Sequence, residues 1–328
     1  MWTRRRFLAV MLGAAGGPSS SLPQLSAQPS RRIFRLASLS ELPRFPLAEA
    51  RWRRALQTRG YVEGKTVTFD FRWGDGRPQT LKRIAAELVA TKPDVILTTG
   101  TPAALAAKET TSTIPIVTHS SDPIGERLVA TLSRPGANVT GVFVPLDELA
   151  TKRVQFLNEI VPHLRTVAIV SNPTHPTARS QAKSAEAAAR MLRISSHRIS
   201  LMKESDVERA FAEIVAARAD GIVLTQEAVT FQAIPRIAEA AAKNRLPASH
   251  AYREFADAGG LMAYGVNLDE VFALAAFSVD RILTGANPAQ LPVQQPTKFE
   301  LVINLKTAKA LGLTIPSSLL TRADEIIE

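Results

Sequence analysis

The stretch ILTTGTPAALAAKET, residues 96–110, changes from a strand pattern to a helix pattern around one glycine. An apolar run leads into Gly100, and Pro102 opens an alanine-rich segment. We expect Thr101 to be the N-cap and Pro102 the first residue of the helix. A strand, a glycine turn and a helix in this order form one unit of a parallel α/β sheet. The unpaired N–H groups at such a helix end also suit a small anion.

The same alternation of strand and helix continues along the chain. The sequence predicts strands at residues 32–37, 66–72, 94–97, 114–117, 139–142, 167–170, 221–224, 247–249 and 261–264. It predicts helices at residues 46–59, 81–89, 147–161, 177–192, 206–218, 232–243 and 268–284. Unbroken apolar runs are typical of parallel strands covered on both faces, whereas Val67, Phe69 and Phe71 alternate with polar residues and indicate a sheet edge. Two successive β/α units predict an α/β fold with two lobes on parallel sheets.

Ligands of open parallel sheets bind at the carboxyl ends of the strands, so the cleft between two such lobes is the expected site. The residues that we expect to bind a ligand there are polar or aromatic and follow the predicted strands: Ser38, Ser40, Gly100, Thr101, Ser120, Ser121, Asp122, Asn172, Gln226, Glu227, Tyr252 and Tyr264. His119 and His250 also follow strands and are expected to form hydrogen bonds. Ser, Thr, Asn and Asp equally cap helices for local reasons, which is the alternative for each of them.

A zwitterion would fit this set of groups. Its carboxylate would accept hydrogen bonds from the N–H groups of one lobe. Its ammonium would pair with Asp122 or Glu227, and its side chain would pack against an aromatic ring. We expect Asp122, followed by Pro123, to cap a helix and so repeat the arrangement of Thr101 and Pro102. Asn172 with Pro173 is expected to repeat it in the second lobe.

The first 27 residues predict export. Three arginines at 4–6 precede an apolar run of about ten residues, a secretory layout too short to span a bilayer and similar to a twin-arginine signal. Leu25-Ser26-Ala27 fits a cleavage site, so we expect a periplasmic protein that begins at Gln28; an uncleaved N-terminal anchor is the alternative. The chain has no cysteine, which excludes disulfides and a lipidated cysteine.

Composition and motifs exclude several other classes. The 328 residues suffice for two domains. The net charge of +10 is spread along the chain without basic blocks, so we expect no nucleic-acid partner. The sequence contains no phosphate-binding G-x-x-x-x-G-K-[ST] loop, no G-x-G-x-x-G after a strand, no G-x-S-x-G elbow and no metal-type histidine spacing. We therefore expect no catalytic residues, no metal and no cofactor.

Four stretches carry a resemblance to a known family. They are RGYVEGK at residues 59–65, GTPAA at 100–104 with STIPIV at 112–117, REFADAGGLM at 253–262, and QPTKFELVIN at 295–304. Through them the chain resembles the ABC-transporter substrate-binding family, whose members include tryptophan- and tyrosine-type binding proteins, over residues 33–328.

The resemblance implies the periplasmic-binding-protein type I fold, in which two Rossmann-like lobes close on a ligand. It implies one lobe of residues 28–146 with about 266–296, and another of 147–265 with about 297–328. It also implies a monomer that delivers a small solute, such as an aromatic amino acid, to a membrane permease and its ATPase through a peripheral contact. The loop at residues 224–229, LTQEAV, departs from the acid-and-asparagine loop of the amino-acid binders, so the resemblance does not imply an ammonium contact there. An acidic or neutral organic solute is the alternative to an amino acid.

Two other functions remain alternatives at this point. A periplasmic sensory module of the same fold would pass closure to a membrane sensor, and an enzyme of doubly wound fold would turn its ligand over. A LacI-like repressor needs an N-terminal helix-turn-helix, which a signal sequence replaces here.

Overall fold

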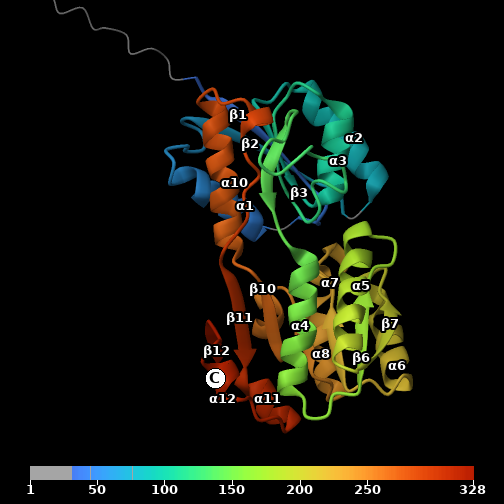
Figure 1. The fold of residues 1–328 in the computed structure, drawn as a ribbon. Coiled ribbons are helices and arrows are strands. Elements are labelled where there is room, and N and C mark those ends of the chain that lie inside the picture. Colours follow the sequence, from blue (N-terminus) through green and yellow to red (C-terminus); the bar gives the residue numbers. More distant parts are fainter. Residues whose placement is uncertain (1–31, 45, 76) are drawn as a thin grey trace, which may run out of the picture. The chain divides into compact units, whose positions relative to one another are not determined.

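The computed structural model describes residues 32–44, 46–75 and 77–328, which form two α/β lobes (Figure 1). The signal peptide expected at residues 1–27 lies outside the described residues. None of the helices in the described part combines the length and the apolar character that crossing a bilayer requires.

The first lobe is built on a five-stranded parallel sheet of order β2-β1-β3-β4-β5. Its strands are β1 (Phe34–Ser40), β2 (Val67–Trp73), β3 (Val95–Thr99), β4 (Ile116–Ser120) and β5 (Val139–Phe143). Its helices are α1 (Pro46–Gln57), α2 (Pro78–Ala90), α3 (Thr101–Thr110) and α10 (Leu268–Leu283). The alternating strand β2 lies at the sheet edge, as its pattern predicts.

Both faces of this sheet are buried. On one face, Leu36 and Leu97 pack with Trp52 of α1 and Phe272 of α10; the neighbouring Ile96 points to the other face, toward α2 and α3. Figure 1 shows α1 beside α10 and α2 beside α3. This two-sided cover explains why the central strands read as unbroken apolar runs.

The second lobe has a seven-stranded sheet of order β12-β11-β10-β9-β8-β6-β7. Its strands are β6 (Thr166–Ser171), β7 (Ser195–Ser200), β8 (Gly221–Leu224), β9 (Ala248–His250), β10 (Met262–Val266), β11 (Phe299–Asn304) and β12 (Glu325–Ile327). Its α-helices are α4 (Leu146–Ile160), α5 (Pro176–Met191), α6 (Val207–Ala216), α7 (Ala228–Gln232), α8 (Ile234–Lys243), α9 (Arg253–Asp257), α11 (Leu305–Leu311) and α12 (Ser317–Leu320). Short 3₁₀ turns lie at Glu204–Asp206 and Pro288–Gln290.

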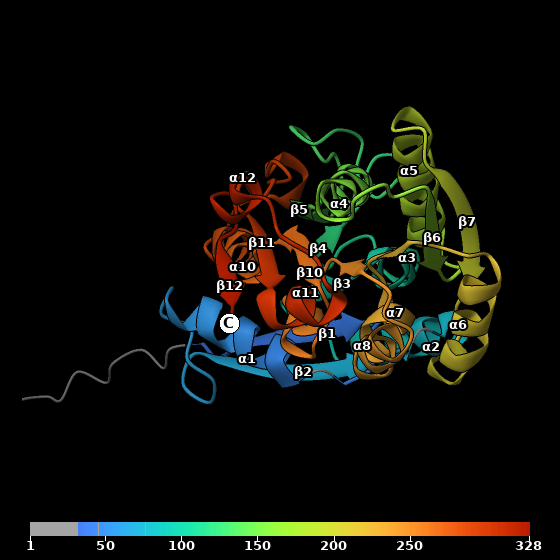
Figure 2. The same ribbon diagram turned by 90° about the horizontal axis from the view of Figure 1, so that it is seen from below.

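Three features of this second sheet differ from the sequence-based picture. β7, β11 and β12 were not predicted as strands; β7 and β12 are its two edges (Figure 2). β11 pairs antiparallel with β10, so the sheet is mixed rather than wholly parallel. The other predicted strands and helices are present, with ends displaced by a few residues and the helix at 232–243 preceded by the separate turn of α7.

The chain passes between the lobes three times: from β5 into α4, from β10 into α10, and from the segment at 291–294 into β11. Gln294 pairs with Val142 beside β5 before the chain enters β11. Glu270, at the start of α10, accepts hydrogen bonds from the backbone N–H groups of Thr297 and Lys298, which ties the second and third crossings together. The domain boundaries expected from the sequence stay predictions.

Candidate functional site

A cavity of about 100 Å³ lies at the carboxyl ends of the strands of both sheets. First-lobe residues after β1, β3 and β4 line it: Glu41, Leu42, Thr99, Gly100, Thr101, His119, Ser120 and Ser121. Second-lobe residues after β6, β8 and β9 face them: His175, Thr177, Gln226, Glu227, Phe231 and Tyr252. The helices α1 and α10 and the first two crossings complete the lining with Ala48, Arg51, Val144, Leu146, Val266, Leu268, Val271 and Phe272.

The glycine turn after β3 holds a carboxylate that belongs to the protein. Gly100 directly precedes α3 and has a φ of 89°, which glycine adopts without strain. A Cβ at this position would lie 2.2 Å from Cδ of Glu41, so the missing side chain is what lets Glu41 lie over the turn. The expected N-cap is therefore wrong: the helix begins at Thr101 itself, and no side chain of the N-cap residue Gly100 can cap it.

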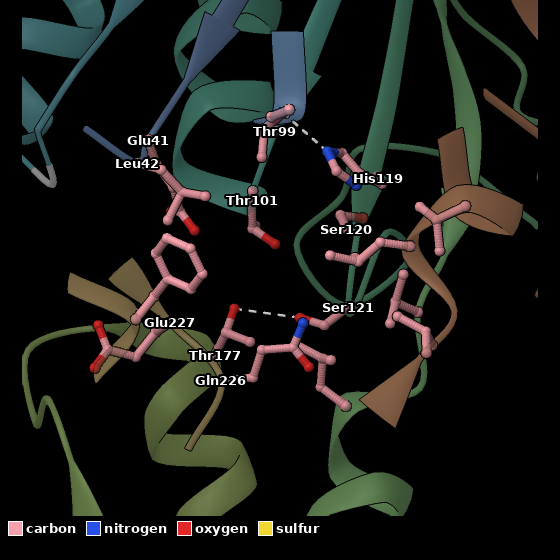
Figure 3. Close-up of a pocket in the computed structure, with 18 of the residues that line it drawn as sticks. Glu41, Leu42, Thr99, Thr101, His119, Ser120, Ser121, Thr177, Gln226 and Glu227 are labelled. Atoms are coloured by element: carbon pink, nitrogen blue, oxygen red, sulfur yellow. Dashed lines mark hydrogen bonds between the residues drawn. The ribbon is translucent and has the colours of Figure 1, made fainter. Parts of the chain in front are cut away.

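Two hydrogen bonds join the lobes across the cavity. Nε2 of His175 lies 3.1 Å from Oε2 of Glu41. Oγ of Ser121 donates to Oγ1 of Thr177 at 3.2 Å (Figure 3). The side chains of His175 and Glu41 are only 13% and 10% exposed. Each of these pairs has one partner in each lobe.

His175 is the N-cap of α5, with Pro176 as the first helical residue. Its Nδ1 accepts a hydrogen bond from the N–H of Ala178 at 3.4 Å. Burial alone would lower the pKa of His175, but the hydrogen bond and charge of Glu41, together with the charge of Glu227, raise it above its ordinary value. The expected cap at Asn172 is wrong, because this side chain accepts from Thr174 in the preceding turn.

Glu227 acts as a cap rather than as a free acid. Its carboxylate accepts from the N–H groups of Val229 at 2.7 Å and Thr230 at 3.0 Å, at the start of α7. Burial raises the pKa of Glu227 to about 7, against the opposing effect of these two hydrogen bonds and of His175. Figure 3 shows the carboxylate pointing away from Gln226 and Thr177.

A buried side chain of α5 fixes the loop that carries Gln226. Oε1 of Gln181 accepts from the N–H of Gln226 at 2.8 Å, and Nε2 donates to the carbonyl of Gln226 at 3.0 Å. Nη2 of Arg153 donates to the same Oε1 at 3.2 Å, and burial lowers the pKa of Arg153 to about 10. The position of Gln226 in the cavity therefore depends on residues that do not line it.

Aromatic rings form part of the apolar lining. Phe231 and Tyr252 of the second lobe are in edge contact, with ring centroids 4.8 Å apart. Phe272 of α10 packs edge-on against His119 at 5.6 Å. Nε2 of His119 is 2.9 Å from Oγ1 of Thr99, and burial lowers the pKa of His119 to about 4, so the imidazole is neutral at neutral pH. The cavity thus offers ring faces and edges beside polar groups.

Among the described residues that line the cavity, Arg51 of α1 is the only lysine or arginine. Its Nε donates to Oδ1 of Asp269 at 3.2 Å, and its Nη2 is 3.9 Å from Oε1 of Glu254 in the second lobe. Its Nη1 is buried and has no hydrogen-bond partner among the described residues. Elsewhere, no three His, Asp or Glu side chains of the described part gather closely enough to hold a metal ion.

A family model for ABC transporter substrate-binding proteins matches residues 50–327. The chain belongs to this family. Its members are substrate-binding proteins, and the match bears out the resemblance that the four sequence stretches carry.

Three relatives extend the comparison. A tyrosine-binding protein of Clostridioides difficile (strain R20291) is 25% identical over 281 residues, covering 85% of this chain and 80% of that protein. The crystal structure of a conserved domain protein from Vibrio cholerae O1 biovar El Tor str. N16961 is 30% identical, covers 90% of this chain and 100% of its own, and has a TM-score of 0.82. An ABC domain from Streptococcus pneumoniae in complex with L-Trp has the same coverage and TM-score at 23% identity, which shows the shared fold. The expected periplasmic-binding-protein type I fold is confirmed.

The structure brings seven of the twelve predicted site residues to the cavity: Gly100, Thr101, Ser120, Ser121, Gln226, Glu227 and Tyr252. The other five, Ser38, Ser40, Asp122, Asn172 and Tyr264, lie outside its lining. Ser38 and Ser40 are buried in β1, and Tyr264 packs edge-on against Phe156 of α4. Ligand binding by all twelve stays a prediction.

Asp122 requires a correction of its local role. The residue is exposed, and its Oδ1 accepts from the N–H of Gly125 at 2.8 Å within a run of turns that contains no helix. It therefore caps a turn and not a helix. His119 lines the cavity as expected, whereas His250 is buried beneath it, with Nδ1 accepting from the N–H of Tyr252.

Sequence reasoning missed Glu41, Arg51, His175 and Phe272. Glu41 directly follows β1, so the strand-end argument that selected Ser40 applies equally to it. His175 before Pro176 is the N-cap pattern that was sought at Asn172. Arg51 and Phe272 lie on helices, where the helical period indicates a solvent face or a core position and gives no sign of a cavity.

Proposed function

We propose that the protein is the exported, periplasmic substrate-binding component of an ABC importer. It captures a small solute in the cavity between its lobes and delivers it unchanged to a membrane permease with its ATPase. The observation that carries this proposal is the shared lining: polar groups from the strand ends of both lobes converge on one cavity, and two hydrogen bonds cross it.

Closure explains how such a site works. A solute that contacts both lobes binds the closed state more tightly than the open one, so binding shifts the equilibrium toward closure. The closed lobes then present a surface that the permease recognises. The family membership supports this role, and the absence of a phosphate loop or nucleophile motif in the sequence supports release of the solute without chemistry.

We propose an aromatic amino acid as the solute. The rings of Phe231, Tyr252 and Phe272 suit an aromatic side chain through edge contacts. The curated relative from Clostridioides difficile is named for tyrosine, and the structural neighbour from Streptococcus pneumoniae holds L-Trp.

Isothermal titration of the purified protein with L-tyrosine and L-tryptophan tests the solute, and we expect one-site binding in the micromolar range or tighter. Mass spectrometry of whatever co-purifies provides an unbiased readout, and recovery of a chemically altered ligand would favour an enzyme. Uptake of the labelled solute by cells with and without the gene tests transport. Cells that lose the gene and keep full uptake, while a co-purifying membrane sensor is recovered, would support the sensory alternative instead.

A further inference from the structure

Two acidic side chains line the cavity, and they are in different situations. Glu227 uses its carboxylate to cap α7 and directs it away from Gln226 (Figure 3). Glu41 caps no helix. Glu41 as a whole is 8% exposed. Of its two carboxylate oxygens, only Oε2 forms a hydrogen bond with another described residue, namely with Nε2 of His175. Oε1 therefore retains its capacity to accept a hydrogen bond.

The position of Glu41 is fixed from two sides. Its own N–H donates to the carbonyl of Thr99 at 3.0 Å, which keeps the backbone beside β3. Gly100 provides the space under the side chain, because any Cβ there would collide with it. A carboxylate held in this way needs little reorganisation to receive a partner, which favours tight recognition.

This geometry reverses the charge expected at the glycine turn. The N-terminal end of α3 favours an anion, but Glu41 already lies over Gly100 at that end. A carboxylate of a solute at the same place would meet the charge of the buried Glu41, and like charges repel more strongly away from bulk water. A solute with a positive group there would be attracted.

We propose that Oε1 of Glu41 binds a cationic group of the solute, so that the protein selects small ammonium-bearing molecules, such as amino acids with a free α-amino group, over organic acids and neutral solutes. The assignment rests on the proposed function and adds to it the charge class of the solute. In the closed state Glu41 then binds His175 through Oε2 and the solute through Oε1. Recognition of the ammonium is thereby coupled to closure of the lobes.

The test compares matched ligands on the purified full chain by isothermal titration. L-tryptophan is paired with indole-3-propionate, which lacks the ammonium, and with tryptamine, which lacks the carboxylate. L-tyrosine and L-leucine are paired with their des-amino acids in the same way. We expect each amino acid to bind at least about 100-fold more tightly than its des-amino partner, the effect of removing the partner of a buried charge.

Variants then test whether Glu41 is the residue that selects ammonium-bearing ligands. Glu41→Gln should reduce the preference for the amino compounds to less than about 5-fold, because the amide keeps the shape of the side chain and removes its charge. Glu41→Asp, which keeps the charge on a shorter side chain, should keep a clear preference at lower affinity. Glu109→Gln on the exposed end of α3 is the matched control and should keep the wild-type ratio. Circular dichroism checks that each variant is folded.

The outcomes separate this proposal from the proposed function. Preference for leucine over tyrosine and tryptophan, with des-amino acids rejected, would remove the aromatic solute and support Glu41 as the cation site. Tight binding of a des-amino acid by the wild type would overturn the cation site while keeping a transport role. A wild-type ratio in Glu41→Gln, or loss of the preference in Glu227→Gln instead, would also overturn it. Binding of none of these ligands would overturn both.

Discussion

The imidazole of His175 donates a hydrogen bond through Nε2 to Oε2 of Glu41, over 3.1 Å and across the cleft between the lobes. The direction follows from the other ring nitrogen: Nδ1 accepts from the N–H of Ala178, so the proton of the neutral ring resides on Nε2. One residue thus caps a helix of the second lobe and contacts the strand end of the first. This pair joins the two lobes through a titratable side chain.

The pair predicts a pH-dependent stability, whose sign follows from the pKa of His175. That pKa is raised in the folded state, because burial and the repulsion of Arg179, which lower it, are outweighed by the hydrogen bond and charge of Glu41 and the charge of Glu227. A raised histidine pKa stabilises the fold below the unfolded-state value of about 6.5, and this stabilisation is lost as pH rises through the folded-state value. We expect His175→Gln to lose about 1–3 kcal/mol of unfolding free energy at pH 6 and less at pH 9.

Urea unfolding of the two proteins across pH 5.5–9 measures this difference. His197→Gln on the exposed edge strand β7 is the control and should follow the wild type throughout. A gap between wild type and His175→Gln that stays constant from pH 6 to pH 9 would contradict the raised pKa of His175.

The collision between a side chain at Gly100 and Glu41 predicts a strong effect of Gly100→Ala. The alanine would be strained at a φ of 89° and its Cβ would displace the carboxylate from His175. We expect a loss of about 3 kcal/mol in unfolding free energy and at least a tenfold loss of solute affinity. Thermal or urea unfolding and isothermal titration measure the two effects.

Gly60 provides the matched control for this substitution. It has a φ of 87°, and a Cβ there would meet nothing within 4 Å. Gly60→Ala should therefore lose only the strain energy, about 1 kcal/mol, and bind solute normally. Equal losses in both alanine variants would show that Glu41 does not depend on the space at Gly100.

Gln181 predicts how strongly the site depends on a residue outside it. The side chain is fully buried and makes hydrogen bonds to both backbone groups of Gln226 and to Arg153. Gln181→Met keeps most of the volume and removes these bonds, so we expect a loss of about 2–4 kcal/mol in stability and weaker binding through displacement of Gln226. Gln57→Met on the exposed end of α1 should change neither quantity by more than about 0.5 kcal/mol.

The fold was predictable wherever a strand is covered on both faces. Such strands appear in the sequence as apolar runs. Their order along the chain, with a helix between successive strands, is compatible with only a few sheet topologies. β7 escaped prediction because it is an exposed edge strand of sequence SSHRIS, and β12 has only three residues. Neither has a run or an alternation that stands out from a loop. β11 returns antiparallel from the other lobe, which no local pattern indicates.

The site was predictable as a place but only partly as a set of residues. Parallel strands put their ends together, which placed Thr101, Ser120 and Gln226 correctly on the cavity. Which side chains point inward depends on the turn after each strand, and this sends Asp122 outward. The pairing of Glu41 with His175 joins residues 134 positions apart and follows from closure of the lobes, so it has no counterpart in any one stretch of sequence.

The position of Asp122 leads to a prediction that separates turn capping from ligand binding. Its carboxylate accepts from the N–H of Gly125 and is exposed outside the cavity lining, although it was expected to hold the ammonium of the solute. Loss of one such cap costs about 1 kcal/mol, so we expect Asp122→Ala to lower the unfolding free energy by about that amount. We expect its solute affinity to stay within twofold of the wild type, because Asp122 lies outside the cavity lining. Urea unfolding and isothermal titration on the same preparation provide both numbers. A tenfold loss of affinity with unchanged stability would return Asp122 to the site and show that the turn moves inward when the solute binds.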